Sequence, residues 1–176
     1  MQVTLEVKRV NSELDNGTPY TQGYDLEVPD HFTVLDLLIK VREEEDETLA
    51  LRCSCRASIC GSCAMRINGH AGLACKTKLV NVMTSEGLVK VEPAGNLPVV
   101  KDLVVDMNPF WEKVHSIQPW LHTKGPQPEA EHLVSADAMQ HLTGVMGCIM
   151  CGACVSDCTV LEVDKNFLGP AALAKA

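Results

Sequence analysis

Residues 53–75 read CSCRASICGSCAMRINGHAGLAC and hold five of the nine cysteines of the chain. Counted from Cys55, the spacing is C-x4-C-x2-C, and eleven residues separate Cys63 from Cys75. This spacing is typical of a plant-type [2Fe–2S] cluster. Such a cluster needs four thiolates, and a tight loop can supply three while a neighbouring hairpin supplies the fourth. We therefore expect Cys55, Cys60, Cys63 and Cys75 to be its ligands.

The fifth cysteine of this stretch, Cys53, does not fit the ligand spacing. A count starting at Cys53 gives x6 in place of x4, so we exclude it and expect a small, partly buried thiol. The alternative to a cluster is a structural zinc site, which also accepts four thiolates. Zinc ribbons usually pair two C-x2-C units, whereas here only Cys60 and Cys63 form one. We expect Gly61 to let backbone amides approach the cluster closely.

The other four cysteines form a second group, Cys148-x2-Cys151-x2-Cys154-x3-Cys158. Three cysteines at this spacing bind three corners of a [4Fe–4S] cluster, and the fourth binds a second cluster in two-cluster proteins. No cysteine follows Cys158. The remaining ligands are therefore expected from a longer form of the chain or from a partner. Gly147 and Gly152 are expected to allow close backbone contact here as well.

Composition excludes several classes of protein. An apolar content of 46% can supply a buried core, which argues against a disordered chain. The net charge of −8 opposes nucleic-acid binding, because that binding depends on basic residues. No apolar run approaches the roughly 20 residues that span a bilayer, and residues 1–10 do not resemble a signal peptide. We expect a soluble protein of the cytoplasmic side, and the odd cysteine count argues against disulfides.

The first half of the chain alternates between the periods of strands and of a helix. Residues 3–8 and 24–28 alternate apolar and polar side chains, which predicts a β-hairpin with Asn16-Gly17 in its turn. Thr33 and Asp36 form a candidate helix cap before an apolar stripe at helical spacing. The acidic run Glu43–Glu47 predicts a solvated helix end, with a docking patch as the alternative.

Further strands complete this first unit. Asn68-Gly69 predicts a tight hairpin and Leu88–Glu92 a strand, so about 90 residues form a small α+β unit. Beyond it, residues 93–110 read as a connector whose segment Val99–Val105 is buried. Helices are expected at Phe110–Leu121 and from Ser135 into the second cysteine group, with an exposed proline-containing loop at residues 119–131.

With both cysteine groups in this order, the chain resembles the iron–sulfur subunits of succinate dehydrogenase and fumarate reductase. The resemblance covers nearly the whole chain. Beyond the two cysteine groups it rests on seven short segments: RCSCR at 52–56, ICGS at 59–62, NG at 68–69, GLAC at 72–75, LPV at 97–99, DLVVDM at 102–107 and FLGPAAL at 167–173.

The resemblance implies an α+β fold of two domains. Residues 1–104 would form a β-grasp, plant-type [2Fe–2S] ferredoxin domain, and residues 105–176 an incomplete, helical, bacterial-ferredoxin-like domain. Four cysteines of the first group would hold [2Fe–2S]. In the second group, Cys148, Cys151 and Cys154 would hold [4Fe–4S], and Cys158 one iron of [3Fe–4S]. Because the family continues past the GPAA helix, we expect the sequence to be truncated near Ala176.

The resemblance also implies a function without a catalytic residue on this chain. Electrons would pass between FAD in a partner flavoprotein that acts on succinate or fumarate and a quinone at membrane-anchor subunits. The chain would then be peripheral, on the cytoplasmic face of the cell membrane. Two alternatives are an iron–sulfur subunit of a different flavin-dependent complex and a standalone [2Fe–2S] electron carrier.

Overall fold

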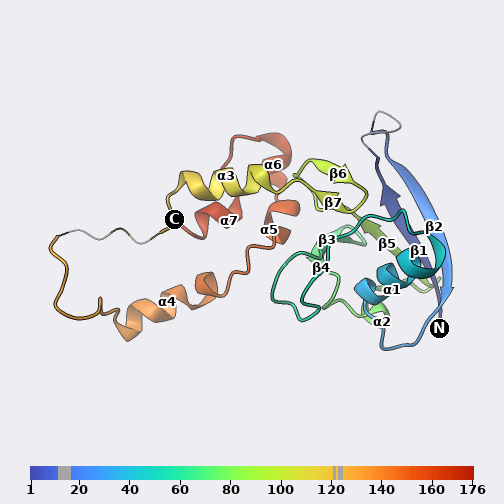
Figure 1. Cartoon of the computed structure of the whole chain (residues 1–176), viewed down its shortest axis with the longest axis horizontal. Coiled ribbons are helices and arrows are strands. Elements are labelled where there is room, and N and C mark those ends of the chain that lie inside the picture. Colours follow the sequence, from blue (N-terminus) through green and yellow to red (C-terminus); the bar gives the residue numbers. More distant parts are fainter. Residues whose placement is uncertain (12–16, 121, 123–124) are drawn as a thin grey trace.

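A five-stranded mixed sheet forms one end of the molecule (Figure 1). The computed structural model describes residues 1–11, 17–120, 122 and 125–176. The strand order is β2-β1-β5-β3-β4. Strand β1 runs antiparallel to β2 and parallel to β5, and β3 runs antiparallel to both β4 and β5. The strands are β1 (Gln2–Arg9), β2 (Tyr20–Glu27), β3 (Ala64–Ile67), β4 (His70–Leu73) and β5 (Leu88–Glu92).

The predicted first hairpin is confirmed. Val3, Leu5 and Val7 are buried on one face of β1, as the alternating pattern requires. Strand β2 pairs with β1 along its whole length, from Gln2 opposite Glu27 to Arg9 opposite Tyr20. Asn16 of the predicted turn lies outside the described residues.

The first helix, α1 (Val34–Lys40), begins at the predicted cap. The backbone N–H of Asp36 donates to the hydroxyl of Thr33 at 3.2 Å, and the Asp36 carboxylate accepts from the Thr33 N–H at 2.9 Å. These bonds satisfy donors that a helix start leaves unpaired. The helix continues as a π-helical turn, η1 (Val41–Glu45), whose three glutamates are exposed, as the predicted solvated helix end requires.

The turn between β3 and β4 confirms the second predicted hairpin. Asn68 and Gly69 both have positive φ, 49° and 83°, as a two-residue hairpin turn of this kind requires. The side-chain amide of Asn68 donates to the carbonyl of Val82, and its oxygen accepts from the N–H of Lys90 at 2.8 Å. The turn is thereby tied to β5 and to the short helix α2 (Leu79–Val82).

The connector differs from its prediction in one respect. It forms a small antiparallel hairpin of β6 (Val99–Lys101) and β7 (Val104–Val105), so its side chains alternate and Val100 is 47% exposed. Leu103 packs into the core of the sheet, whereas Val105 packs into a second hydrophobic cluster. The expectation of one continuous buried segment was therefore wrong.

Helices form the other end of the molecule (Figure 1). They are α3 (Asn108–Ser116), α4 (Ala136–Met146), α5 (Ala153–Ser156), α6 (Thr159–Val163) and α7 (Pro170–Leu173). Helix α3 ends before the predicted boundary at 121, since the chain turns at Gln118, whose φ is 50°. Helix α4 begins as predicted, capped by Ser135, and lies apart from the other helices in Figure 1, with no buried residue.

Two hydrophobic clusters occupy the two ends. The first joins one face of the sheet to α1, and the second joins α3, α5, α6 and α7 to the segment 94–105. This segment contributes Leu103 to the first cluster and Ala94, Leu97 and Val105 to the second. The predicted domain boundary at residue 104 thus falls in a stretch that packs on both sides, and the boundary remains a prediction.

A buried arginine fastens the connector hairpin to the sheet. Arg9, at the end of β1, donates through Nε to Asp102 at 2.8 Å and through Nη1 to Asp46 at 2.7 Å. The Arg9 and Asp102 side chains are only 3% and 2% exposed. Asp102 also accepts the backbone N–H groups of Val10 and Ala50. A buried charge is tolerated only when it is paired and hydrogen-bonded in this way.

Asp46 completes this network. The hydroxyl of Thr48, then the phenol of Tyr24 and the Arg9 guanidinium, hold the pKa of the Asp46 carboxyl well below its usual range. Burial and the hydrogen bond to Asp46 raise the pKa of Tyr24 to about 12. The carboxylate of Asp46 is therefore charged and the phenol of Tyr24 neutral at physiological pH.

The substitution Asp102→Asn should destabilise the fold. It leaves Arg9 buried with one carboxylate fewer, and breaking a buried ion pair from one side costs about 3 kcal/mol or more of unfolding free energy. Urea unfolding followed by circular dichroism measures this loss. Lys8→Gln is the control, because the Lys8–Glu92 pair is exposed and such pairs contribute less than about 1 kcal/mol. Equal losses in the two variants would contradict the role assigned to Asp102.

Candidate iron–sulfur sites

The first cysteine loop curls around the sulfur of Cys55. The backbone N–H groups of Ala57, Ile59 and Cys60 each donate to Cys55 Sγ at 3.3 Å. This curl requires positive φ at Arg56 and Ser58, 53° and 59°. Successive amides that converge on one point create a concave site that favours negative charge. A thiolate or a cluster-bound sulfur is suited to this position.

The remaining predicted ligands of the first group come from the loop and from the β3–β4 hairpin. Cys63 directly precedes β3 and is buried, whereas Cys75 follows β4 by two residues and is half-buried. The carbonyl of Cys63 accepts the N–H of Ala74 at 3.1 Å, which joins the two ends of the hairpin. The hydroxyl of Ser58 lies 3.8 Å from Cys75 Sγ and links the loop to the hairpin.

The thiols of this group have contrasting environments. A hydrogen bond with the Ser62 hydroxyl at 3.1 Å is the largest influence on exposed Cys60, and it lowers the pKa of that thiol to about 6. Burial raises the pKa of Cys63 to about 11, and the neighbouring sulfurs of Cys75 and Cys60 add to this effect. Because thiolates are the form that binds metal, the lowered pKa of Cys60 favours its role as a ligand.

Cys53 is half-buried and packs against the first hydrophobic cluster, as Cys75 does. Its environment agrees with the partly buried thiol expected from the sequence. The assignment of ligands itself remains a prediction.

Gly61 makes a close contact that the sequence did not predict. Its φ is 72°, and a Cβ atom added to it would lie 2.7 Å from the Cβ of Cys151 and 2.9 Å from its Cα. Such a contact is shorter than side chains tolerate. The close approach at Gly61 is therefore to the second cysteine group, and it brings the two groups together.

In the second group, two cysteines influence a third. The sulfurs of Cys151 and Cys148 lie close enough to Cys154 to raise its pKa, after the larger effect of desolvation by surrounding atoms. Gly152 has a φ of 78°, which favours glycine, and it packs beside Met107. Gly147 has an ordinary φ of −73° and caps α4, so its backbone conformation does not itself require glycine.

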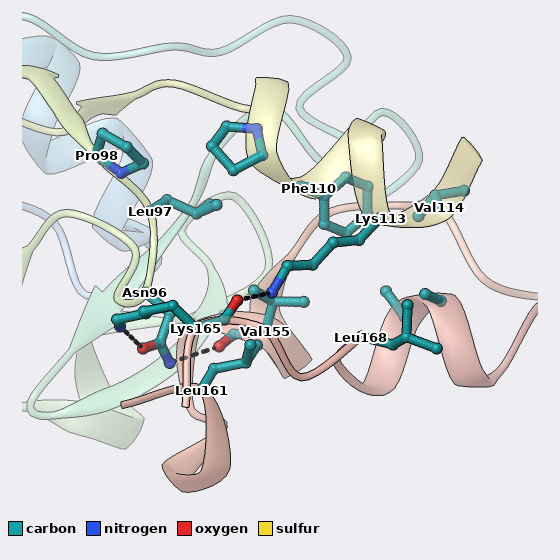
Figure 2. A pocket seen from close by; sticks show the side chains of 13 residues that line it. Asn96, Leu97, Pro98, Phe110, Lys113, Val114, Val155, Leu161, Lys165 and Leu168 are labelled. Atoms are coloured by element: carbon teal, nitrogen blue, oxygen red, sulfur yellow. Dashed lines mark hydrogen bonds between the residues drawn. The ribbon is translucent and has the colours of Figure 1, made fainter. Parts of the chain in front are cut away.

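Cys158 lies in a different environment, and its hydrogen-bond partner Asn96 lines an apolar cavity. It is half-buried, packs against the second hydrophobic cluster, and its carbonyl accepts the side-chain amide of Asn96 at 2.9 Å. The cavity has a volume of about 460 Å³ and lies between α3, α6 and α7 (Figure 2). Figure 2 shows Lys165 donating to Asn96 and Lys113 donating to the backbone carbonyl of Lys165. Lys113 also donates to the backbone carbonyl of Phe167.

Asn96 is a positioning residue that the sequence does not indicate. Its φ of 61° is one that asparagine adopts more readily than most residues, and this preference is the only local signal. Its partners are the carbonyls of Val155 and Cys158, far along the chain. Sequence spacing contains no information on such a contact.

The donor set fits iron–sulfur clusters. Each group offers thiols, and the first also offers amide N–H groups directed at sulfur, which stabilise a cluster. Among the described residues, no three His, Cys, Asp or Glu side chains converge as they would around a single metal ion. An iron–sulfur cluster instead distributes its cysteine ligands over separate iron atoms. No helix in the described part of the chain is long and apolar enough to cross a membrane.

Comparisons with known proteins agree with this chemistry. Residues 4–112 match the family described as a 2Fe-2S iron-sulfur cluster binding domain. The chain is 39% identical over 175 residues to a fumarate reductase iron-sulfur subunit of Mycobacterium tuberculosis. It is 37% identical over 177 residues to a mitochondrial succinate dehydrogenase [ubiquinone] iron-sulfur subunit of Oryza sativa. Each match covers 98% of this chain, and 70% and 62% of those two relatives.

A solved structure gives the same relationship. A chain of the Mycobacterium smegmatis Sdh1 complex in the apo form superimposes with a TM-score of 0.81 at 26% identity. The superposition covers 97% of this chain and 70% of that one. The α+β fold and the [2Fe–2S] ferredoxin domain expected from the sequence are thereby confirmed. The chain belongs to the family of iron–sulfur subunits of fumarate reductase and succinate dehydrogenase, the electron-transfer subunits of these oxidoreductases.

Proposed function

We propose that Cys55, Cys60, Cys63 and Cys75 hold a [2Fe–2S] cluster. Support comes from their spacing, from the amides around Cys55 and from the contacts that join the loop to the β3–β4 hairpin. Cys53 is not a ligand in this proposal, because a count that starts at Cys53 does not give the C-x4-C-x2-C spacing. The β-grasp domain that carries this cluster ends near residue 104.

The second cysteine group serves two further clusters in this proposal. Cys148, Cys151 and Cys154 hold three irons of a [4Fe–4S] cluster, and Cys158 holds one iron of a [3Fe–4S] cluster. The different surroundings of Cys158 support this division. The remaining ligands come from residues outside this sequence. A helical, bacterial-ferredoxin-like domain starting near residue 105 carries both clusters.

The function follows from the order of these sites. The clusters, when bound, each take up and release one electron. The residues of this chain fix the separation of the sites, exclude water around the buried sulfurs and direct backbone amides at the exposed ones. The electrons move between FAD in a partner flavoprotein, which interconverts succinate and fumarate, and a quinone held at membrane-anchor subunits. The chain is peripheral, on the cytoplasmic face of the membrane.

One observation carries this proposal more than any other. The loop that holds Cys60 and Gly61 lies in van der Waals contact with Cys151, so close that a Cβ on Gly61 would collide with it. Two cysteine groups far apart in the sequence are thus neighbours in space. An electron relay requires this closeness, because tunnelling weakens steeply with distance.

The choice of ligands for the [2Fe–2S] cluster is tested by two cysteine variants. Cys60→Ser should alter or abolish the electron paramagnetic resonance (EPR) signal of the reduced [2Fe–2S] cluster, because it replaces a thiolate ligand. Cys53→Ser is the matched control in the same loop and should leave the signal unchanged. Loss of the signal in Cys53→Ser would refute the assignment of ligands.

The number of clusters is tested by measuring the iron content. An anaerobic count of iron and acid-labile sulfide in the native complex should give about nine iron atoms per copy of this chain, as two, four and three for the three clusters. A count of about two iron atoms would leave only the first cluster. In that case the second cysteine group would hold none, and the proposed relay to quinone would be wrong.

A further inference from the structure

Asp157 forms a bridge between the second cysteine group and the β3–β4 hairpin. It lies between Cys154 and Cys158, and its Oδ2 accepts the backbone N–H of Ala71 at 2.7 Å. Its Oδ1 lies 3.3 Å from Nε of Arg66. Arg66 is on β3 and Ala71 on β4, so one carboxylate contacts both strands of the hairpin.

The hairpin that Asp157 contacts is the one flanked by predicted cluster ligands. Cys63 directly precedes β3 and Cys75 follows β4 by two residues. Asp157 itself directly precedes Cys158. The bridge therefore connects backbone segments that carry ligands on both sides of the junction between the two cysteine groups.

Arg66 depends on this contact. Its Nε is buried and has no hydrogen-bond partner among the described residues, and the Asp157 carboxylate is its ion-pair partner there. A buried donor without a hydrogen bond is costly, and the nearby carboxylate offsets part of this cost. The pair holds the hairpin against α5 even though the two side chains are 30% and 36% exposed.

Helix α5 has a second polar anchor. The hydroxyl of Ser156, a residue that is 0% exposed, accepts the N–H of Gly95 at 2.8 Å. A Cβ on Gly95 would lie 2.6 Å from the carbonyl oxygen of Ser156. Helix α5 is thus held by residue 95 as well as by the hairpin. Asp157 provides the polar link to the hairpin.

We propose that Asp157 is a positioning residue for electron transfer between the first and second clusters. This role rests on the proposed function, in which both cysteine groups hold clusters. Its carboxylate fixes the hairpin relative to the second cysteine group and thereby keeps the Gly61 loop against Cys151. One electron passes across this junction and no bond forms or breaks, so the separation of the two sites is what the residue controls.

The test compares variants in the purified native complex. Asp157→Ala removes both contacts, whereas Asp157→Asn and Arg66→Gln each remove the ion pair and keep an acceptor for the Ala71 N–H. Glu162→Gln is the control, since Glu162 is an exposed acid on α6 close to the same cysteines in sequence. Two readouts are taken: hydrogen exchange at the Ala71 amide, and microwave power saturation of the reduced [2Fe–2S] EPR signal.

In Asp157→Ala the Ala71 amide should exchange faster, and the [2Fe–2S] signal should saturate at lower power. The second change follows because a paramagnetic neighbour relaxes the signal less as it moves away. The line shape of the signal and the iron content should stay those of the wild type, which separates a change of position from a loss of the cluster. Asp157→Asn and Arg66→Gln should give intermediate saturation, and Glu162→Gln should match the wild type.

Three outcomes would overturn the positioning role. They are wild-type saturation in Asp157→Ala, an equal change in Glu162→Gln, or, if Asp157→Ala does not assemble, wild-type saturation in both Asp157→Asn and Arg66→Gln. A failure of the proposed function gives a different result. In that case the wild-type complex itself would show no relaxation of the [2Fe–2S] signal by a second cluster, and this inference would fall with it.

Discussion

The contact between Gly61 and Cys151 is the constraint on which the arrangement of this protein depends. Only a residue without a side chain can bring the first cysteine loop this close to the second. The contact requires the β3–β4 hairpin and α5 to meet in one register, and hydrogen bonds of Asp157 and Ser156 hold α5 in place. Two groups of thiols that are distant in sequence thereby become neighbours in space.

The segment 94–105 connects the two ends of the molecule mechanically. At one end of it, Gly95 and Asn96 bond to α5 and to the carbonyl of Cys158. At the other, Asp102 forms a buried ion pair with Arg9 and accepts two backbone N–H groups. Both anchors are largely buried, where polar contacts are costly to break. The second cysteine group is therefore attached through this segment to the sheet that positions the first.

The features that the sequence predicted correctly are local. Alternation in β1, the Thr33–Asp36 cap and the Asn68-Gly69 turn each depend on residues a few positions apart, and each was found. The cysteine spacing is of the same kind. The incorrect predictions concern features that depend on contacts between residues far apart in the sequence. Val100 is exposed because its segment folds back as a hairpin, and α3 ends early because the chain turns at Gln118. The contacts of Asn96 and Asp157 join residues that are distant in the sequence, and no spacing pattern indicates them.

The difference between the features that the sequence predicts and those that it does not has a physical reason in the function of the chain. A catalytic site needs reactive side chains, whose types can be recognised in a sequence. An electron relay needs its ligands, surroundings that tune the reduction potentials, and fixed separations. Fixed separations come from ordinary packing, from a missing Cβ at Gly61 and from a carboxylate at Asp157 that bonds to a backbone amide. None of these residues has a reactive role, so the geometry that governs electron flow becomes visible only when the two cysteine groups are seen side by side.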